Sequence, residues 1–309
     1  MNKVVYKPEG ERLFTEENIF YTSSISNMEK AIEKNLILEG KATLCDTDKN
    51  LIINFGEFRG IIPREECVLQ ETEKENRDIA VITRVNKPVC FCVREIREQN
   101  GEKIAVLSRK DAQKFALDEI MKLPKGTILD GKITHLEPFG AFVDIGCGIV
   151  SLITIDSISV SRIPHPEERF YRDQKIKCII KDIDKEKERI YLSHKELLGT
   201  WDQNADLFSP GQTVSGIVRS IEDYGVFIEL TPNFAGLSDL VDGIKEGDHA
   251  AVYIKNIIPE KMKVKLTIVD FFDSPCEEPV NNYFITSGQI KKWRYSSEKC
   301  SKVIETDFE

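Results

Sequence analysis

The chain lacks any apolar stretch long enough to cross a membrane. It has 309 residues, of which 41% are hydrophobic, but no run reaches the roughly 18 apolar residues that a spanning helix needs. Its first residues, Met1 to Tyr6, also lack the apolar core of a signal peptide. We therefore expect a cytoplasmic protein without a membrane partner, divided into about two to four small domains.

Metal-binding and disulfide patterns are missing as well. The eight cysteines include no C-x-x-C pair, and Cys90 and Cys92 form only a C-x-C on an expected strand. Structural zinc sites and disulfide frameworks depend on more regular cysteine spacings. The sequence therefore predicts free thiols and no metal site.

Recognisable catalytic motifs are also absent. The four histidines are scattered, and the chain has no G-x-S-x-G, no glycine-rich phosphate loop and no H-E-x-x-H. Its many carboxylates form no recognisable pair. We expect no enzyme activity and no cofactor.

The chain has fewer positively than negatively charged residues. The formal net charge is −9 and the isoelectric point is about 5.3. Avid, non-specific binding to duplex DNA depends on neutralising phosphates, so this balance argues against it. Single-strand binding stays open, because stacking carries much of its energy and positive charge is needed only locally.

What the sequence does contain is a repeat. The string F-G-A-F-V-D-I-G at residues 139–146 has a counterpart, Y-G-V-F-I-E-L, which begins 85 residues later at Tyr224. The same spacing relates Lys125-Gly126 to Pro210-Gly211 and Asp130-Gly131 to Ser215-Gly216. Self-similarity at a fixed period indicates an array of one small β module.

Read as a strand, the repeated string has two different faces. Ala141 and Val143 point one way, whereas Phe142 and Asp144 share the other face. A charged residue is seldom buried unpaired, so we expect the face with Asp144, and the matching face with Glu229, to be solvated.

The aromatic residues of the repeat then become candidate ligand contacts. Gly140 permits a bend that brings Phe139 to the same face as Phe142. Two rings on an exposed β surface favour a platform for nucleobases. The alternative for these rings, and for Tyr224 and Phe227, is burial in a barrel core.

Turn and capping signals divide the chain into five segments. They are an N-terminal extension (1–35), a diverged first module with a linker helix (36–122), a second module with its linker (123–208), a third module (209–273) and a tail (274–309). In the first module we expect strands at 51–56, 60–63, 79–85 and 89–96. We also expect a helix from about 108 to 122, with one apolar face formed by Ala112, Phe115, Ala116 and Ile120. The tail has apolar patches on both sides of Ser287-Gly288, so it should form a hairpin there or pack on the third module. About five short strands per module with glycine turns favour a five-stranded oligonucleotide-binding (OB) barrel.

The second module resembles an S1 RNA-binding domain. The resemblance rests on Gly126 and Gly131, F-G-A-F-V-D at 139–144, Asp184, and R-I-Y-L-S-H-K at 189–195. The third module resembles this domain nearly as well and the first only weakly. Together they make about three quarters of the chain similar to the short, three-repeat form of the bacterial ribosomal protein S1 family. The resemblance implies an all-β fold of tandem five-stranded S1-type OB barrels joined by short helical linkers.

The resemblance also implies an RNA-binding face, which in this family consists of two aromatics, a histidine, an aspartate and a basic residue. The matching residues of the second module are Phe139, Phe142, Thr154, Asp184 and Arg189, and those of the third are Tyr224, Phe227, Asp239 and Lys263. Thr154 and Asp239 stand in place of the histidine. The first loses a ring, and the second brings a charge that should repel phosphate. The first module lacks the aromatic pair.

Further basic residues are open to two interpretations. Lys132 and Arg219 should lie on the outer face of the first strand of their modules, as phosphate contacts or as ordinary solvated residues. The basic loop with Arg162, His165, Arg169 and Arg172 either extends the RNA path or is a solvated surface.

These observations favour an RNA-binding protein of translation. We expect binding to single-stranded RNA, in particular mRNA, association with the small ribosomal subunit, and a monomer when free. The alternative is a regulatory or adaptor protein that acts mainly through protein contacts, or in RNA turnover or transcription. Salt-dependent affinity for short unstructured RNA separates the two.

Overall fold

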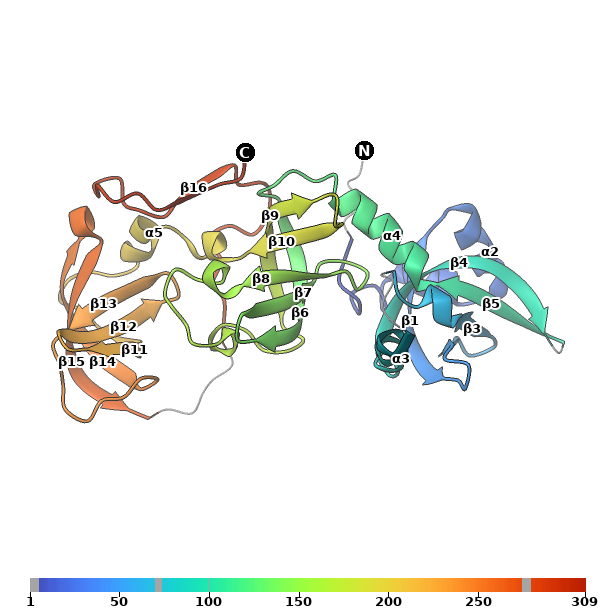
Figure 1. Cartoon of the computed structure of the whole chain (residues 1–309), viewed down its shortest axis with the longest axis horizontal. Coiled ribbons are helices and arrows are strands. Elements are labelled where there is room, and N and C mark those ends of the chain that lie inside the picture. The colour runs from blue at the N-terminus through green and yellow to red at the C-terminus, as the bar shows by residue number, and fades with distance from the viewer. Residues whose placement is uncertain (1–5, 70–73, 100, 274–278) are drawn as a thin grey trace. The chain divides into compact units, whose positions relative to one another are not determined.

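The structure is a computed structural model that describes residues 6–69, 74–99, 101–273 and 279–309 (Figure 1). The chain forms two compact units. Unit 1 comprises Met1–Leu123, Asp130–Lys132 and Asp144–Val150, and unit 2 comprises Pro124–Leu129, Ile133–Val143 and Ser151–Glu309. Among the residues described, no helix combines the length and apolar character needed to span a membrane.

The first barrel is closed by five strands in the order β1-β2-β3-β5-β4. Their bounds are β1 Ile37–Cys45, β2 Leu51–Asn54, β3 Arg59–Ile62, β4 Pro88–Gln99 and β5 Glu102–Ser108. Helices α1 (Glu16–Thr22) and α2 (Ile25–Glu33) precede it, and Met28 and Ala31 of α2 are buried with the barrel core. The side chain of Ser24 caps α2 by accepting a hydrogen bond from the Asn27 amide.

The prediction of one strand of this barrel is wrong. Residues 79–85 were predicted to be extended, but α3 (Lys74–Ile82) covers most of them, after the short 3-10 helix η1 (Arg64–Glu66). In this helix Val81 is buried, while Ile79 and Ile82 are 60% and 47% exposed. A short apolar run fits either a strand or one buried helix face, so periodicity alone does not distinguish them.

The predicted linker helix is confirmed as α4 (Arg109–Ile120). Ser108 caps it by accepting a hydrogen bond from the Asp111 amide. Ala112, Ala116 and Ile120 are buried as the apolar spacing predicted, but Phe115 is 46% exposed.

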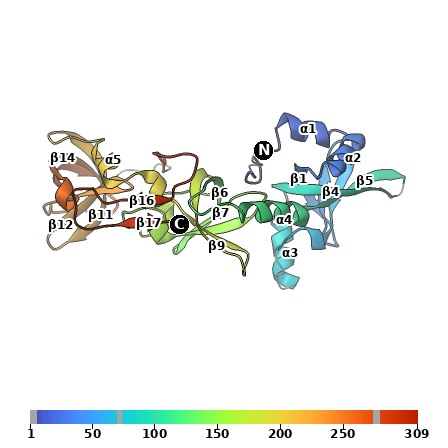
Figure 2. The ribbon, with the colours of Figure 1, turned by 90° about the horizontal axis from the view of Figure 1, so that it is seen from above.

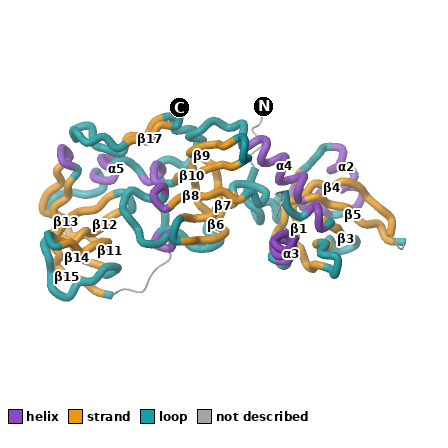
Figure 3. Tube along the Cα trace, viewed as in Figure 1, coloured by secondary structure: helices purple, strands orange, loops and turns teal. Residues whose placement is uncertain are grey.

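The second and third barrels repeat the topology of the first, with orders β10-β8-β7-β6-β9 and β11-β12-β13-β15-β14. The second has β6 Ile128–Glu137, β7 Gly140–Asp144, β8 Val150–Thr154, β9 Lys175–Asp184 and β10 Arg189–Ser193. The third has β11 Thr213–Glu222, β12 Gly225–Thr231, β13 Phe234–Ser238, β14 His249–Ile258 and β15 Lys263–Phe272. Figure 3 shows that strands dominate and helices are short. The predicted class, tandem five-stranded OB barrels with short helical linkers, is confirmed.

A helical linker joins the second and third barrels. It contains the 3-10 helix η4 (Lys195–Leu198) and α5 (Trp201–Ala205), which Thr200 caps in a capping box. Short 3-10 helices also occur at η2 (Ile155–Ser157), η3 (Pro166–Glu168) and η5 (Pro259–Lys261). Trp201 and Phe208 of the linker both contact the ring of Phe234 in β13, at centroid distances of 5.3 and 5.6 Å. The linker is therefore part of a packed core and not a flexible tether.

The tail packs on unit 2 and contains a small hairpin of β16 (Lys292–Arg294) and β17 (Glu305–Asp307). The expected packing of the tail on the third module is therefore observed, whereas the hairpin expected around Ser287-Gly288 is wrong, because the strands that pair lie later in the chain. Figure 2 shows β16 beside α5, and Trp293, Tyr295 and Phe308 belong to the same buried cluster as the third barrel.

Candidate nucleic-acid interface

The two repeated strings place the same pair of rings on the second and third barrels. Phe139 and Phe142 lie 5.9 Å apart between ring centroids at an interplanar angle of 88°, and Tyr224 and Phe227 lie 6.1 Å apart at 90°. Phe139 is 54% and Tyr224 68% exposed, while Phe142 and Phe227 are half-buried. In each pair, an exposed ring therefore lies perpendicular to a half-buried ring on the barrel surface.

The glycine inside each pair is required by close backbone packing. A Cβ atom on Gly140 would lie 2.3 Å from the Ile153 carbonyl oxygen, and one on Gly225 would lie 2.4 Å from that of Ser238. Gly225 also has a φ of 151°, in a region that favours glycine. Glycine therefore lets the start of β7 and of β12 approach the neighbouring strand, which fixes where the following Phe emerges.

Strand register extends the ring pair of the third barrel into a band. Phe227 pairs with Ser220 of β11 and Leu237 of β13, Leu237 pairs with Lys265 of β15, and Lys265 pairs with Asn256 of β14. The residues on either side of Phe227, Val226 and Ile228, are fully buried, so the band lies on the outer face. Within this band, Lys265 is separated from the ring of Phe227 by Leu237, so aromatic, apolar and basic groups follow one another, a composition suited to a base and its phosphate.

The second barrel has a richer version of this band. Leu152 of β8 pairs with Tyr191 of β10, and Tyr191 pairs with Asp182 of β9. On the opposite side, His135 of β6 stacks on Phe142, with ring centroids 6.1 Å apart and an interplanar angle of 29°. Its Nε2 lies 2.6 Å from a carboxylate oxygen of Glu137.

Sequence reasoning missed His135, because strict alternation that starts from Lys132 selects only even-numbered residues for the outer face. In the third barrel a register shift lies between Val218 and Ser220, and this bulge moves the outward position one residue along the strand. His135 lies at the position equivalent to Ser220, 85 residues earlier. The repeat spacing combined with the bulge that OB barrels tolerate in their first strand could have identified it.

The remaining predicted residues lie around the ends of the strands. Thr154 ends β8, and its hydroxyl donates to Ser157 Oγ at 3.1 Å. Asp184 and Arg189 face each other in register at the β9–β10 turn, where Asp184 accepts the amides of Glu186 and Lys187 at 3.1 and 3.0 Å. Arg189 is exposed. Their contact with RNA stays a prediction.

In the third barrel, Lys263 and Asp239 are both exposed. Lys263 begins β15 opposite Ile258. The carboxylate of Asp239 is 93% exposed and lies 3.7 Å from the ammonium of Lys255, so a neighbouring cation partly offsets the charge that was expected to repel phosphate.

Arg219 does not lie free on the outer face, so that expectation is wrong. Its side chain is 9% exposed and contacts Glu229 at 3.0 and 3.2 Å and Glu168 at 2.5 Å. Arg169 of the predicted basic loop is also buried, and its guanidinium lies 2.5 Å from Glu229. Both arginines are committed to carboxylates and are unavailable to phosphate. Lys132, in unit 1, donates from its ammonium to the Glu9 carbonyl at 3.2 Å.

The acids of the repeated strings are likewise not solvated. Asp144 is 3% exposed and accepts the amides of Glu9, Gly146 and Gly148 at 2.8, 2.9 and 3.0 Å. Burial, and then the nearby charge of Glu9, raise the pKa of Asp144 to about 7. Glu229 is 5% exposed. Alternation placed these acids on the correct side of the strand, but other segments cover them.

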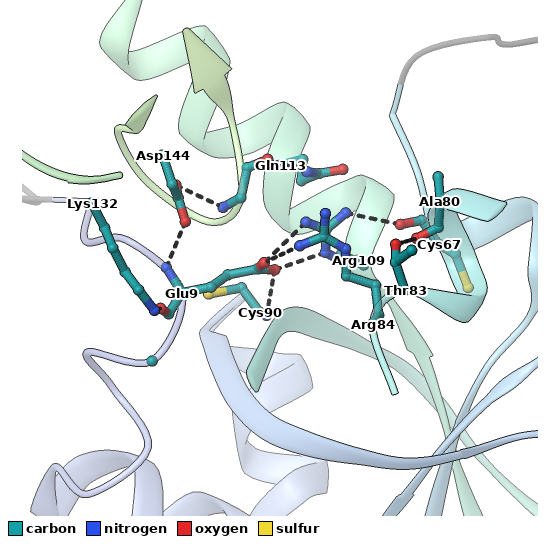
Figure 4. Close-up of polar contacts among 12 residues, drawn as sticks. Glu9, Cys67, Ala80, Thr83, Arg84, Cys90, Arg109, Gln113, Lys132 and Asp144 are labelled. Atoms are coloured by element: carbon teal, nitrogen blue, oxygen red, sulfur yellow. Dashed lines mark hydrogen bonds and ion pairs between the residues drawn. The ribbon is translucent and has the colours of Figure 1, made fainter. Parts of the chain in front are cut away.

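Glu9 is the centre of a buried polar network in unit 1 (Figure 4). Its carboxylate lies 2.7 and 3.0 Å from the Arg109 guanidinium and 3.4 Å from Arg84, and it accepts the Cys90 amide at 3.1 Å. Burial alone would raise the pKa of Glu9, but the charge and hydrogen bonds of Arg109 outweigh it and lower the pKa. This network anchors the N-terminal segment and, being enclosed, is not a nucleic-acid contact.

The first barrel has an equivalent band without rings. A bulge between Ala42 and Leu44 matches the bulge of β11, and register then places Ile52 where the third barrel has Phe227. The band continues as Leu44, Ile52, Ile61, Val106 and Glu95. Phe55 and Phe58 of this barrel stack on each other at 5.1 Å and pack against its core instead.

Comparison with known proteins agrees with this geometry. Residues 122–195 match the model of the S1 RNA binding domain. The chain is 30% identical over 249 residues to the small ribosomal subunit protein bS1 of Leuconostoc lactis, covering 74% of this chain and 55% of that protein. It is 28% identical over 290 residues to the protein of the same name from Staphylococcus aureus, covering 87% and 71%. The chain thus spans about half the length of the first relative.

Among solved structures, a multidomain protein with nucleic acid binding domains from Streptococcus pneumoniae matches 77% of this chain and 75% of its own at 15% identity. Its TM-score is 0.25, too low for the likeness to bear on fold or function.

Proposed function

Because this chain is an S1 RNA-binding domain protein related to bacterial bS1, we propose that its second and third barrels bind single-stranded RNA. The observation that carries the proposal is the repeated perpendicular ring pair, with Phe139 and Tyr224 exposed. Unpaired bases can stack on these rings, because every base has a π-face and no duplex has to be opened.

Exposed cations of the same two barrels supply the electrostatic part of this binding. Lys265 lies in the band of the third barrel, Lys263 begins the same strand, and Arg189 is exposed at the β9–β10 turn of the second. Local contacts of this kind bind phosphates even in a chain with a net charge of −9, since the attraction acts over about a Debye length. Affinity should therefore fall as salt is added.

The relatives support a narrower role. Both are small ribosomal subunit proteins by name, and we extend this to mRNA binding in translation, association with the small ribosomal subunit, and a cytoplasmic location. The aliphatic band of the first barrel favours a second candidate function for unit 1, an adaptor role through protein contacts, because it offers apolar surface without a ring on which a base could stack.

Ring removal tests the RNA-binding proposal. Phe139→Ala and Tyr224→Ala, made singly and together in the full chain, should each weaken binding to a fluorescent single-stranded oligouridylate. A stacked base contributes roughly 1–3 kcal/mol, so each variant should lose roughly 5- to 150-fold in affinity. Both rings are largely exposed, so unfolding free energy should change by less than about 0.5 kcal/mol.

Phe115→Ala is the matched control, because Phe115 is 46% exposed on α4 and outside either band. Equal affinity of the double variant and the control, measured in the same buffer, would remove the rings from the binding site. For the ribosomal role, the protein should co-sediment with small subunits in a sucrose gradient at low salt. Recovery only from the top fractions would favour the adaptor function.

A further inference from the structure

A turn of the third barrel is bonded into the second barrel and the linker. The turn between β12 and β13 contains Asn233, which is 1% exposed. Its Oδ1 accepts the Val160 amide at 2.9 Å, and its Nδ2 donates to the carbonyls of Lys195 and Gly199 at 2.8 and 2.9 Å. One side chain thus joins the connection after β8, the helix η4 and the residue that directly follows η4.

A buried ion cluster joins the same two barrels. Glu229 of β12 contacts Arg169, which follows η3 of the second barrel, and Arg219 of its own barrel. Arg219 also reaches Glu168 of the second barrel at 2.5 Å. Since Arg169, Glu229 and Arg219 are all less than a tenth exposed, separating the barrels would strand these charges or require their rehydration.

The tail also forms hydrogen bonds with residues on both sides of the junction between the second and third barrels. The Tyr295 hydroxyl donates to the Asn233 carbonyl at 2.6 Å, and the Tyr295 carbonyl accepts the Trp201 amide at 2.8 Å. Thr306 of the hairpin donates to Glu196 of η4 at 2.9 Å. Earlier in the tail, Ile290 donates its amide to the Gly126 carbonyl at 2.9 Å. The tail therefore contacts the second barrel, the linker and the turn that carries Asn233.

We propose that Asn233 and Tyr295 are positioning residues, which hold the second and third barrels at one fixed orientation so that a single RNA strand binds both. This inference rests on the proposed RNA binding. Two linked sites strengthen each other only when one ligand can span them, and an effective concentration is highest when the geometry is set in advance. A rigid junction without ligand contacts would then raise affinity for long strands alone.

The test compares strand lengths on the full chain. The probes are fluorescent oligouridylates of about 8 nucleotides, enough for one barrel, and about 30 nucleotides, enough for two. The wild-type chain should prefer the long strand strongly, and Asn233→Ala should reduce this preference by about tenfold or more. Affinity for the short strand should stay within about twofold. Asn282→Ala is the control, because Asn282 is an exposed asparagine of the same tail.

Tyr295→Phe provides a second variant should Asn233→Ala fail to fold, since it removes only one hydroxyl from the junction. It should reduce the preference for the long strand in the same direction, by at least about threefold. If wild type binds both lengths and neither folded variant changes their ratio, the positioning role is wrong while RNA binding stands. If wild type binds neither length, both proposals fail.

Discussion

His194 should make the stability of unit 2 depend on pH between about 6.5 and 4. Its ring is fully buried, with Nδ1 donating to the Ile158 carbonyl at 2.8 Å and Nε2 lying 3.2 Å from the Tyr283 hydroxyl. That hydroxyl accepts the Lys177 amide at 3.1 Å, so its own proton is free to be donated to Nε2. The arrangement requires a neutral imidazole protonated on Nδ1.

The size of this pH dependence follows from the pKa of His194. Burial lowers the pKa of His194 from its usual 6.5 to about 4, against the opposing effect of the Ile158 carbonyl. A lowered histidine pKa stabilises the fold fully above 6.5 and loses that contribution as pH falls toward 4. A difference of about 2.5 units at 1.36 kcal/mol per unit amounts to about 3 kcal/mol.

The assay is urea unfolding of wild type and His194→Asn at several pH values from 7.5 to about 4.5. Asparagine keeps a donor for the Ile158 carbonyl but has no proton to gain in this range, so its lost ring packing costs the same at every pH. The stability gap between the two proteins should therefore narrow by roughly 2–3 kcal/mol as pH falls. His135→Asn, at a ring that is 62% exposed, is the matched control substitution. A gap that stays constant across this range would show that His194 is not held neutral.

Two other substitutions test the corrected burial of the repeated strings. Glu229→Gln should cost roughly 3–5 kcal/mol of unfolding free energy because it leaves two buried arginines short of a carboxylate, whereas Glu222→Gln, at an exposed position of β11, should cost under about 0.5 kcal/mol; equal losses would mean that the cluster is solvated. Phe142→Ala should weaken oligouridylate binding by roughly 1–3 kcal/mol and lower stability by less than the roughly 3–5 kcal/mol of a fully buried Phe, and a larger loss on unfolding with unchanged RNA affinity would place Phe142 in the core.

Much of the fold is predictable because short local sequence patterns specify it and because these patterns repeat. The 85-residue period, the glycines before each Phe, and the capped helix after Ser108 all specify geometry within a few residues. The helix α3 was not predictable in this way. Its apolar residues Ile79, Val81 and Ile82 fit a strand pattern, and only the core of the folded barrel selects Val81 as the buried one.

The residues of the candidate site were likewise predictable only in part. Alternation identified the ring pairs, because a Phe between two buried residues must emerge on the outer face. It missed His135, since a bulge like that of β11 shifts the outward position by one residue, and the sequence shows no Gly or Pro at that point to mark it. The repeat itself contained the missing information, as the bulge of β11 is shared by equivalent strands.

Asp144 and Glu229 show what no single module can specify. Each lies two residues after the ring-bearing Phe, on the same side of the strand. The Phe is nevertheless partly exposed, whereas the acid is buried. The covering groups come from distant parts of the chain, from the Glu9 amide for Asp144 and from Arg169 for Glu229. They also differ in kind. Amide groups bind Asp144, and burial raises its pKa despite their hydrogen bonds, while two guanidinium groups balance the charge of Glu229. Each of these strands therefore has two roles: its Phe remains partly exposed, and its acid forms buried contacts with a segment from elsewhere in the chain.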